Sequence, residues 1–358
     1  MNLNEVKRMI PLWFRARSPI YLRSAPGIGK TSVIEAAVPQ LSSLLRRNIG
    51  IVTLNGGNLN VMDTMGYLMP ETRDGVKISE FSKPFWWFTD EGKTLDQYDG
   101  GIIFIDEEDK APIDVKKVLG EMKLSMRFGP HRLPPGWVTW SAGNRAEDRS
   151  GSTKDLDHLI NRRVEINVTP HLQSWKDWAF KAGINPIFIA YAENNSEVVF
   201  PVGIPEHQGP WCTPRSFVQM ARDLDVFAED NGGNIPTDSL TQEHVAGGMG
   251  HGAVASMFAY IKLGQEMPSY HDIIAHPDTT KVPGRADAQM LVCYRLAAKV
   301  EESEMDPVVR YVERLPKEFS VTFAKAACRR DADLLNTPAI ARWCASNHSI
   351  MTAISSRD

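Results

Sequence analysis

The chain has 358 residues, of which 42% are hydrophobic and 23% are charged, and its formal net charge is −4. This composition is that of an ordinary globular protein, and the length suits two or three domains with a large hydrophobic core. The acidic balance argues against a protein that mainly coats nucleic acid, because neutralising phosphates requires clustered Lys and Arg, although a local basic groove stays open.

The N-terminal region begins with an amphipathic pattern. Residues 3–15 carry apolar side chains at helical spacing between charges, which predicts a helix and not the apolar segment of a secretion signal. No apolar run approaches the length that spans a membrane, so we expect a cytoplasmic protein without membrane contact. A strand over 19–22 leads into SAPGIGKT (24–31), and a helix over 30–45 follows, which Pro39 could kink or divide.

Residues 49–100 begin with a second strand, 49–55, and are irregular afterwards. The segment NVMDTMGYLMPETRDGVKISEF (60–81) has the glycine-punctuated alternation of a hairpin, with its turn at 73–76. The aromatic run FWWF at 85–88 could line a pore or stack on bases. We expect it instead to pack the following helix against the sheet, because bulky aromatic residues dominate cores.

The next segment alternates strands and helices. The continuous apolar run at 101–105 predicts a strand buried on both faces of a parallel sheet. Further elements are expected as a helix over 112–124, a hairpin over 124–136, a buried strand over 137–144, and a helix, a break and a strand over 156–170. This alternation predicts an α/β domain over 1–170, in which helices flank a parallel sheet.

Beyond residue 170 the patterns are helical. Helices are expected over 174–183, 185–194, 214–229, 286–300 and 307–315, with a polar linker over 229–241. We therefore expect an α-helical lid over 171–240 and a helical extension over 241–358. Metal sites are not expected here, because the thiols form no C-x-x-C pair and the histidines lack ligand spacing. The residues concerned are Cys212, Cys293, Cys328 and Cys344, which we interpret as reduced and mostly buried, and His251 and His271.

The segment SAPGIGKT has the features of a phosphate-binding loop. Such a loop binds phosphate through backbone N–H groups, and Gly27 and Gly29 let the chain curl around the anion. Lys30 can reach terminal phosphates, and the Thr31 hydroxyl can bind Mg²⁺. The residues expected to contact the nucleotide are Ser24, Ala25, Pro26, Gly27, Ile28, Gly29, Lys30, Thr31 and Ser32. Ser24 stands where the usual pattern has Gly, and since Ser is small we expect little functional damage.

Acidic residues directly follow the buried strand at 101–105. Asp106 can hold Mg²⁺ through its water shell, and Glu107 can orient and deprotonate an attacking water. Acidic clusters also cap helices, and this is the interpretation that we favour for Glu108 and Asp109. For Asp106 and Glu107, the strand in front and the glycine-containing loop upstream favour a catalytic role.

Asn144 ends the strand over 137–144. It would lie beside Asp106 if the two strands are neighbours in the sheet, and its amide could position the water or touch the γ-phosphate. Asn is common in turns, so the residue alone would say little. Its place after the two other motifs favours the functional interpretation.

In this order the motifs resemble those of the AAA+ superfamily and, more narrowly, of the MoxR-type ATPases, which are relatives of the McrB and dynein-related branch. The segments that carry the resemblance are SAPGIGKT, GGIIFIDEEDKAP, DVKKVLGEMKL, RFGPHRLPPG, VTWSAGNRAEDRSG, LDHLINRRVEINV and TPRSF, all within residues 1–230. The resemblance implies a P-loop NTPase core followed by a helical lid, hydrolysis of ATP with Mg²⁺, and a homo-oligomeric ring of six subunits. It also implies that the predicted hairpin projects from the ring and can touch substrate.

The resemblance also implies a role for each matching residue. Lys30 and Thr31 would be the Walker A residues, Asp106 and Glu107 the Walker B residues, with Thr31 and Asp106 holding the metal and Asn144 as sensor 1. Arg162 would be the arginine finger that acts on the ATP of the neighbouring subunit, and Arg215 would be sensor 2 on the lid. The family usually has one Arg followed by Phe at the finger position, whereas this chain has two adjacent arginines. We favour Arg162 as the finger, with Arg163 as a substitute, and Arg145 and Arg149 could also face the interface. A surface salt bridge is the ordinary fate of an arginine, but a pre-positioned guanidinium can stabilise charge on a transferred phosphoryl group.

Three functions remain open at this point. The leading hypothesis is an ATP-driven remodelling machine that acts on a protein, for which the resemblance implies a partner with a von Willebrand factor A domain. The alternative is a nucleic-acid translocase or restriction-type motor, but the basic clusters Arg46–Arg47, Arg162–Arg163 and Arg329–Arg330 are too small to favour it. A scaffold that only binds nucleotide would have no chemical need for Glu107, Asn144 and Arg162. No base-reading motif separates ATP from GTP.

Overall fold

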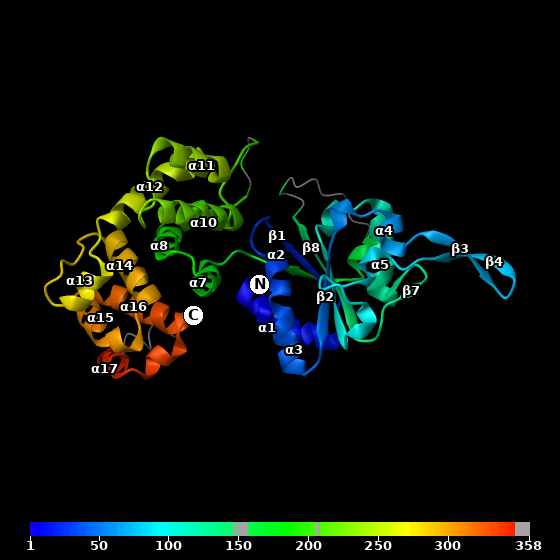
Figure 1. Ribbon diagram of the computed structural model, residues 1–358, viewed down its shortest axis with the longest axis horizontal. Helices are drawn as coiled ribbons and strands as arrows, with labels where there is room; N and C mark the ends of the chain where they lie inside the picture. Colours follow the sequence, from blue (N-terminus) through cyan, green and yellow to red (C-terminus); the bar gives the residue numbers. More distant parts are fainter. Residues whose placement is uncertain (146–147, 149–156, 204, 206–207, 348–358) are drawn as a thin grey trace. The chain divides into compact units, whose positions relative to one another are not determined.

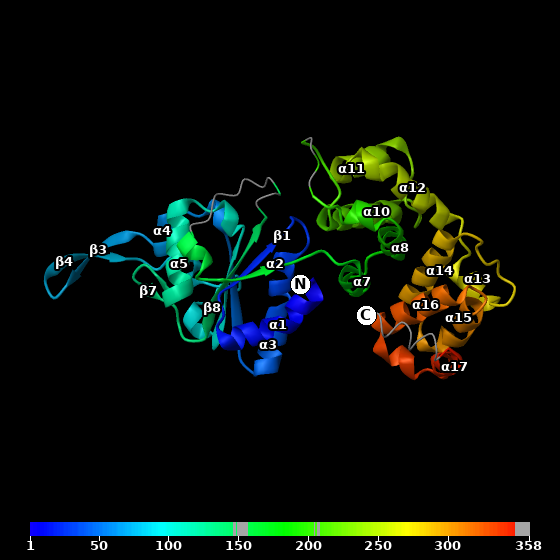
Figure 2. The same ribbon diagram turned by 180° about the vertical axis from the view of Figure 1, so that it is seen from behind.

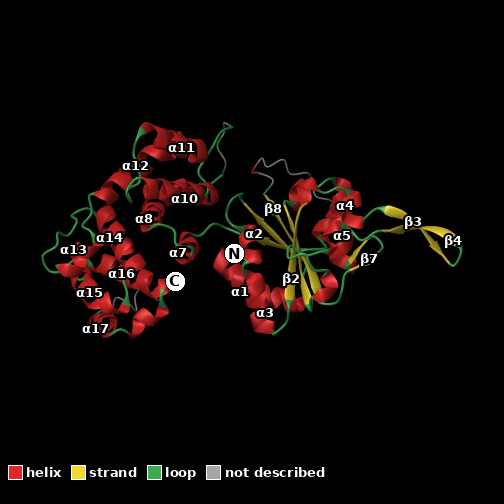
Figure 3. Cartoon of the chain, in the orientation of Figure 1, coloured by secondary structure: helices red, strands yellow, loops and turns green. Residues whose placement is uncertain are grey.

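The computed structural model describes residues 1–145, 148, 157–203, 205 and 208–347. The chain divides into two compact units, with the boundary between His171 and Leu172 (Figures 1 and 2). In the described residues all strands belong to the first unit, and the second unit is helical (Figure 3). The predicted fold class, a parallel sheet flanked by helices and followed by a helical region, is confirmed.

The first unit contains most of the expected elements within a few residues of their predicted bounds. Its helices and strands are α1 (Leu3–Ala16), β1 (Ile20–Ser24), α2 (Lys30–Glu35), α3 (Ala37–Leu45), β2 (Ile49–Asn55), α4 (Val61–Met65), β3 (Leu68–Arg73), β4 (Val76–Phe81), β5 (Gly100–Asp106), α5 (Ile113–Ser125), β6 (Arg127–Phe128), β7 (His131–Arg132), β8 (Trp137–Asn144), α6 (Asp157–Ile160) and β9 (Val164–Asn167). Short 3-10 helices are η1 (Gly56–Asn58), η2 (Phe85–Trp87), η3 (Leu95–Gln97) and η4 (Glu108–Lys110).

The helix expected over 30–45 is two helices, α2 and α3, which are separated at Ala36 and not at Pro39. Pro39 lies in the first turn of α3, where a backbone N–H has no partner inside the helix, so its missing N–H costs no helical hydrogen bond. The break therefore lies before the proline, and α3 contains Pro39 without interruption.

The sheet of the first unit has the strand order β2-β5-β8-β1-β9, and all its neighbouring strands are parallel. The inner strands β5 and β8 are buried almost throughout, as their continuous apolar sequences require. Helices α1, α2 and α3 cover one face, where Trp13 and Phe14 pack edge-on against Trp140. On the opposite face α5 and η2 pack over β2 and β5. Because the strands are parallel, their carboxyl ends lie at one edge of the sheet.

Strands β3 and β4 form the predicted hairpin. Its two turn residues, Asp74 and Gly75, have φ angles of 52° and 79°, and positive φ at both positions is typical of a type I′ turn. The hairpin extends away from the rest of the first unit (Figure 1). In the nearby aromatic run, Trp86 and Trp87 are buried in the core, which agrees with the packing interpretation, whereas the two flanking phenylalanines are exposed.

The second unit is built from helices around one hydrophobic core that includes Trp175 and Trp343. Its helices are α7 (Leu172–Lys181), α8 (Pro186–Asn194), α9 (Ser196–Val199), α10 (Pro214–Asp230), α11 (Ser239–Met249), α12 (His251–Gln265), α13 (Tyr270–Ala275), α14 (Ala286–Lys299), α15 (Met305–Val312), α16 (Lys317–Arg330) and α17 (Pro338–Ser346), with 3-10 turns at η6 (Glu302–Glu304) and η7 (Ala332–Asn336). The core draws on both 171–240 and 241–358, so the division into a lid and an extension stays a prediction. In the part of the chain that the structure describes, every helix is too short or too polar to cross a membrane.

Candidate active site

The segment SAPGIGKT forms the turn between β1 and α2. Gly27 and Gly29 have φ angles of 76° and 94°, in the left-handed region that favours glycine, and Gly29 directly precedes α2. This backbone allows successive N–H groups to line an anion-binding concavity. The loop therefore has the conformation that phosphate binding requires.

Lys30 is buried, with 8% of its surface exposed, at the carboxyl edge of the sheet. Its Nζ donates to Oγ of Ser24 at 2.9 Å, to the carbonyl of Ala25 at 3.2 Å and to Oδ1 of Asn144 at 3.1 Å. The register of β1 and β8 pairs Ser24 with Asn144, which is why these groups meet. Ser24, which departs from the usual glycine, contributes a hydroxyl that helps to hold the lysine over its own loop.

Thr31 and Asp106 meet beside Lys30. The Thr31 hydroxyl donates a hydrogen bond to the Asp106 carboxylate, whose other oxygen accepts from the backbone N–H of Glu107 at 2.8 Å. Hydroxyl and carboxylate oxygens are ligands that Mg²⁺ accepts, either directly or through its waters. The donor set at this position therefore fits a magnesium ion.

Glu107 has the φ angle of 51° that non-glycine residues seldom adopt, a feature that clusters at functional sites. Its Oε1 accepts from Nζ of Lys110 at 2.6 Å, and its Oε2 accepts from Nδ2 of Asn55 at 3.2 Å. Asn55 ends β2 and is paired in register with Asp106. Asn55 was not among the residues expected at the site, although it carries the same signal as Asn144, an amide at the carboxyl end of a strand.

Glu108 and Asp109 lie in the first turn of the 3-10 helix η4, which agrees with their interpretation as residues that start a helix, but their burial was not expected. Only 4% and 3% of their surfaces are exposed, and α5 begins after Pro112. Glu108 accepts a hydrogen bond from Nζ of Lys123. A carboxylate can be buried only with partners of this kind, because desolvating an unpaired charge is costly.

The arginines that were considered for the finger differ in their surroundings. Arg163 is buried, with Nη2 3.0 Å from a carboxylate oxygen of Glu165, so its burial within its own unit argues against the substitute role. Arg162 is half-buried, and a Cβ placed on Gly120 of α5 would lie 3.7 Å from its Nη1. Arg145 makes a two-bond contact with the buried carboxylate of Asp148, at 3.1 and 2.8 Å, within its own loop. Arg149 lies outside the described residues.

Arg215 belongs to the second unit. It is exposed in the first turn of α10, a helix that Thr213 caps through a hydrogen bond to the N–H of Ser216. Its role as sensor 2 stays a prediction.

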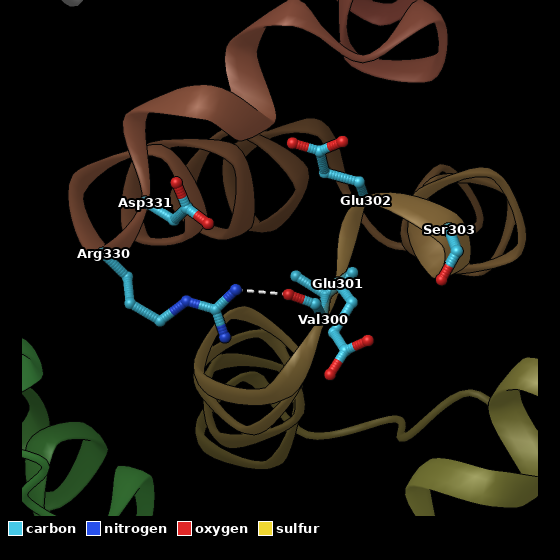
Figure 4. A pocket seen from close by; sticks show the side chains of 6 residues that line it. All are labelled: Val300, Glu301, Glu302, Ser303, Arg330 and Asp331. Atoms are coloured by element: carbon cyan, nitrogen blue, oxygen red, sulfur yellow. Dashed lines mark hydrogen bonds between the residues drawn. The ribbon is translucent and has the colours of Figure 1, made fainter.

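The second unit has a hollow of its own between the start of η6 and the end of α16 (Figure 4). Its lining residues are Val300, Glu301, Glu302, Ser303, Arg330 and Asp331. Arg330 donates to the carbonyl of Val300, and over the described ranges no group of three or more His, Cys, Asp or Glu residues could hold a metal. The hollow thus offers no set of catalytic groups comparable to the edge of the sheet.

No family model matches the sequence, and a search of the curated proteins found no match. Among solved structures, a variant of RuvB from Thermotoga maritima is 13% identical over 76% of this chain and 75% of that chain, with a TM-score of 0.41. NtrX from Brucella abortus, in complex with ADP, is 15% identical over 96% of this chain and 67% of that chain, with a TM-score of 0.40. Likeness at this level does not separate one activity from another.

Proposed function

We propose that this chain is a Mg²⁺-dependent ATPase of the AAA+ type, similar to the MoxR-type ATPases. One observation carries the proposal: Lys30, Asp106 and Asn144 converge at the carboxyl edge of the sheet. Lys30 bonds Asn144, and Asp106 accepts a hydrogen bond from Thr31, the residue after Lys30. A lysine suited to bind phosphate, a pair suited to bind a metal and a polar amide thus meet at one edge of the sheet, as hydrolysis of a nucleoside triphosphate requires.

Phosphate binding uses the loop from Ser24 to Ser32. When the triphosphate enters, Nζ of Lys30 exchanges acceptors such as Ser24 Oγ and the Ala25 carbonyl for phosphate oxygens, while the loop's backbone N–H groups surround the phosphates. Thr31 and Asp106 would hold Mg²⁺. An ion held by these two residues would neutralise the charge that develops on the β- and γ-phosphate oxygens.

Hydrolysis uses Glu107 as the base. Its carboxylate accepts a proton from the attacking water, while the water oxygen bonds to the γ-phosphorus and the bond to ADP breaks. Before that, one carboxylate oxygen must exchange Lys110 for the water, while Asn55 can keep the other oxygen in place. The Asn144 amide, already within 3.1 Å of Lys30, can orient the water or the γ-phosphate.

The remaining parts of the proposal concern assembly and work. Arg162 acts on the ATP of the next subunit in a homo-oligomeric ring, a hexamer by resemblance, and Arg215 senses the nucleotide from the helical lid. A finger supplied in trans is worth roughly 10³ to 10⁵ in rate, so activity depends on assembly. The ring remodels a cytoplasmic protein partner, of which a von Willebrand factor A domain protein is the kind that the resemblance suggests. The exposed hairpin β3–β4 supports a contact with such a partner.

The test is phosphate release from ATP and from GTP with Mg²⁺, together with mass measurements with and without nucleotide. We expect ATP hydrolysis whose specific rate rises with protein concentration as the ring forms. Binding of ATP without turnover at any concentration would contradict the proposal and favour a nucleotide-gated scaffold. Strong, salt-dependent stimulation by DNA would favour a translocase over a protein remodeller.

A further inference from the structure

A line of alternating charges lies between the sheet of the first unit and α5. Nε of Arg23 lies 2.9 Å from Oε1 of Glu165, and Oε2 of Glu165 lies 3.0 Å from Nη2 of Arg163. Nη1 of Arg163 lies 3.6 Å from Oε1 of Glu108, whose other oxygen accepts from Lys123. Arg163 is the central member, and it links the two carboxylates.

The ring of Tyr21 on β1 lies against this line. The guanidinium carbon of Arg163 is 3.7 Å from the ring centre, and Arg23 and Lys123 are 5.5 and 5.6 Å from it. Buried ion pairs are weak evidence for stability, because apolar residues of similar volume are often as stable or more so. What a guanidinium adds in such a place is geometry, since its rigid fork can bond two carboxylates at once.

Two members of this line of charges are sequence neighbours of residues in the proposed reaction. Glu108 follows Glu107 in the chain, and Arg163 follows Arg162. Leu159 of α6 packs directly on α5 at Gly120, where a Cβ would lie 2.2 Å from Cδ2 of the leucine. The backbone that carries Arg162 is thus held on one side by an apolar contact and on the other by Arg163.

We propose, on the basis of the proposed function, that Arg163 is a positioning residue that holds Arg162 in place to act on the neighbouring subunit's ATP. The side chain of Arg162 is long and half-buried, so its reach depends on where its backbone is fixed. A displacement of about 1 Å can cost on the order of 10² in rate when a group must meet a reacting atom. Arg163 supplies that fixation from inside its own subunit, through Glu108 and Glu165.

The experiment is complementation between subunits of the full chain. Arg163→Met removes the bridge and, according to the proposal, leaves the nucleotide site of its own subunit intact, whereas Glu107→Gln disables the site but keeps an intact Arg162. We expect each variant alone to lose at least about tenfold in kcat, with KM for ATP within about twofold for Arg163→Met. An equimolar mixture should regain on the order of a quarter of the wild-type rate, because the intact site of an Arg163→Met subunit can receive its finger from a Glu107→Gln neighbour.

Two control mixtures test whether Arg162 acts in trans and whether Arg163 acts through Arg162. Arg162→Ala mixed with Glu107→Gln should regain activity in the same way, and Arg162→Ala mixed with Arg163→Met should not. If the first control regains activity while Arg163→Met with Glu107→Gln does not, Arg163 serves its own site and the proposal is overturned. If the first control stays inactive, Arg162 does not act in trans, and this proposal is overturned together with the assembly part of the proposed function.

A second variant guards against misfolding. Arg163→Lys keeps the buried charge but cannot bond both carboxylates with one planar group, so it should fold with a near-native melting temperature, and its loss of kcat should also be repaired by Glu107→Gln subunits. If Arg163→Met does not fold, Arg163→Lys decides the question by the same mixtures. A wild-type chain that hydrolyses no ATP contradicts the proposed function itself, and this outcome is separate from every result above.

Discussion

The ammonium group of Lys30 lies 3.1 Å from the amide oxygen of Asn144, which is 114 positions further along the chain. Neither residue could reach the other through local structure. The contact exists because β1 and β8 are parallel neighbours whose register pairs Ser24 with Asn144. A phosphate-binding group and a group able to position water are thereby brought to one point.

Replacing Asn144 by Ala should lower kcat and leave nucleotide affinity within about threefold. The amide is not needed to hold the phosphates, because Lys30 and the backbone N–H groups of the loop bind them, and Ser24 and Ala25 still hold the lysine in place before the nucleotide enters. A lost positioning hydrogen bond in the transition state costs roughly 10² to 10³ in rate. Steady-state phosphate release and fluorescence titration with a labelled nucleotide measure the two quantities. Loss of nucleotide binding with unchanged kcat would show that Asn144 contributes to binding of ATP and not to stabilisation of the transition state.

Glu107→Gln should bind ATP normally and hydrolyse it about 10² to 10⁴ times more slowly, because an amide cannot accept the proton of the attacking water. Glu35→Gln is the matched control, since Glu35 is exposed at the end of α2 in the same unit. Binding titrations and phosphate release check both variants. Normal hydrolysis by Glu107→Gln would assign the base to another residue.

Lys110→Met should raise kcat by up to about fivefold. The ion pair of Lys110 with Glu107 is partly exposed, so breaking it costs about 1 kcal/mol or less, and that cost is removed from the reaction when the lysine is absent. Lys117→Met is the control and should leave kcat unchanged, because Lys117 is exposed on the nearby helix α5. A tenfold decrease in the Lys110 variant would instead mean that the lysine holds the carboxylate in its productive position.

Gly143→Ala should destabilise the first unit by about 1 to 3 kcal/mol through overpacking. A Cβ at this position would lie 2.0 Å from the Tyr21 hydroxyl and 2.8 Å from Oδ1 of Asp109. Gly247→Ala is the opposite case, because a Cβ there meets nothing within 4 Å inside α11, and this change should stabilise by up to about 1 kcal/mol. Urea unfolding measures both, and equal midpoints for the two variants would contradict the packing at Gly143.

The four thiols should react with iodoacetamide at pH 8 in an order set by burial. Burial raises the pKa of Cys212 to about 12 and that of Cys328 to about 11, and it also raises the pKa of Cys293. Since the thiolate is the nucleophile, a raised pKa leaves less of the reactive form at pH 8, and raising the pH toward the pKa increases the rate. Mass spectrometry should find Cys344 modified first, then Cys328, with equal reaction in urea. Early modification of Cys293 would contradict its burial.

Most of the fold could be predicted because its signals are local. The apolar run at 101–105 and the turn at Asp74 and Gly75 depend on periodicity and on φ preferences that neighbouring residues set. A division of the helix over 30–45 was foreseen, but its position at Ala36 was not, and neither was the burial of Glu108. Glu108 is buried because Lys123 and Arg163 arrive from other elements, which local signals do not report.

The sequence by itself determined the glycine-containing loop, the carboxylates after a buried strand and the alternation of strands and helices. These features follow from backbone freedom, side-chain polarity and spacing within short segments. Only the tertiary structure decided that Asn55 contacts Glu107 and that Arg163, not Arg162, is the buried arginine. The two arginines are chemically identical and both lie in the turn before β9, and only the carboxylates of Glu108 and Glu165, which other parts of the fold bring to Arg163, separate their roles.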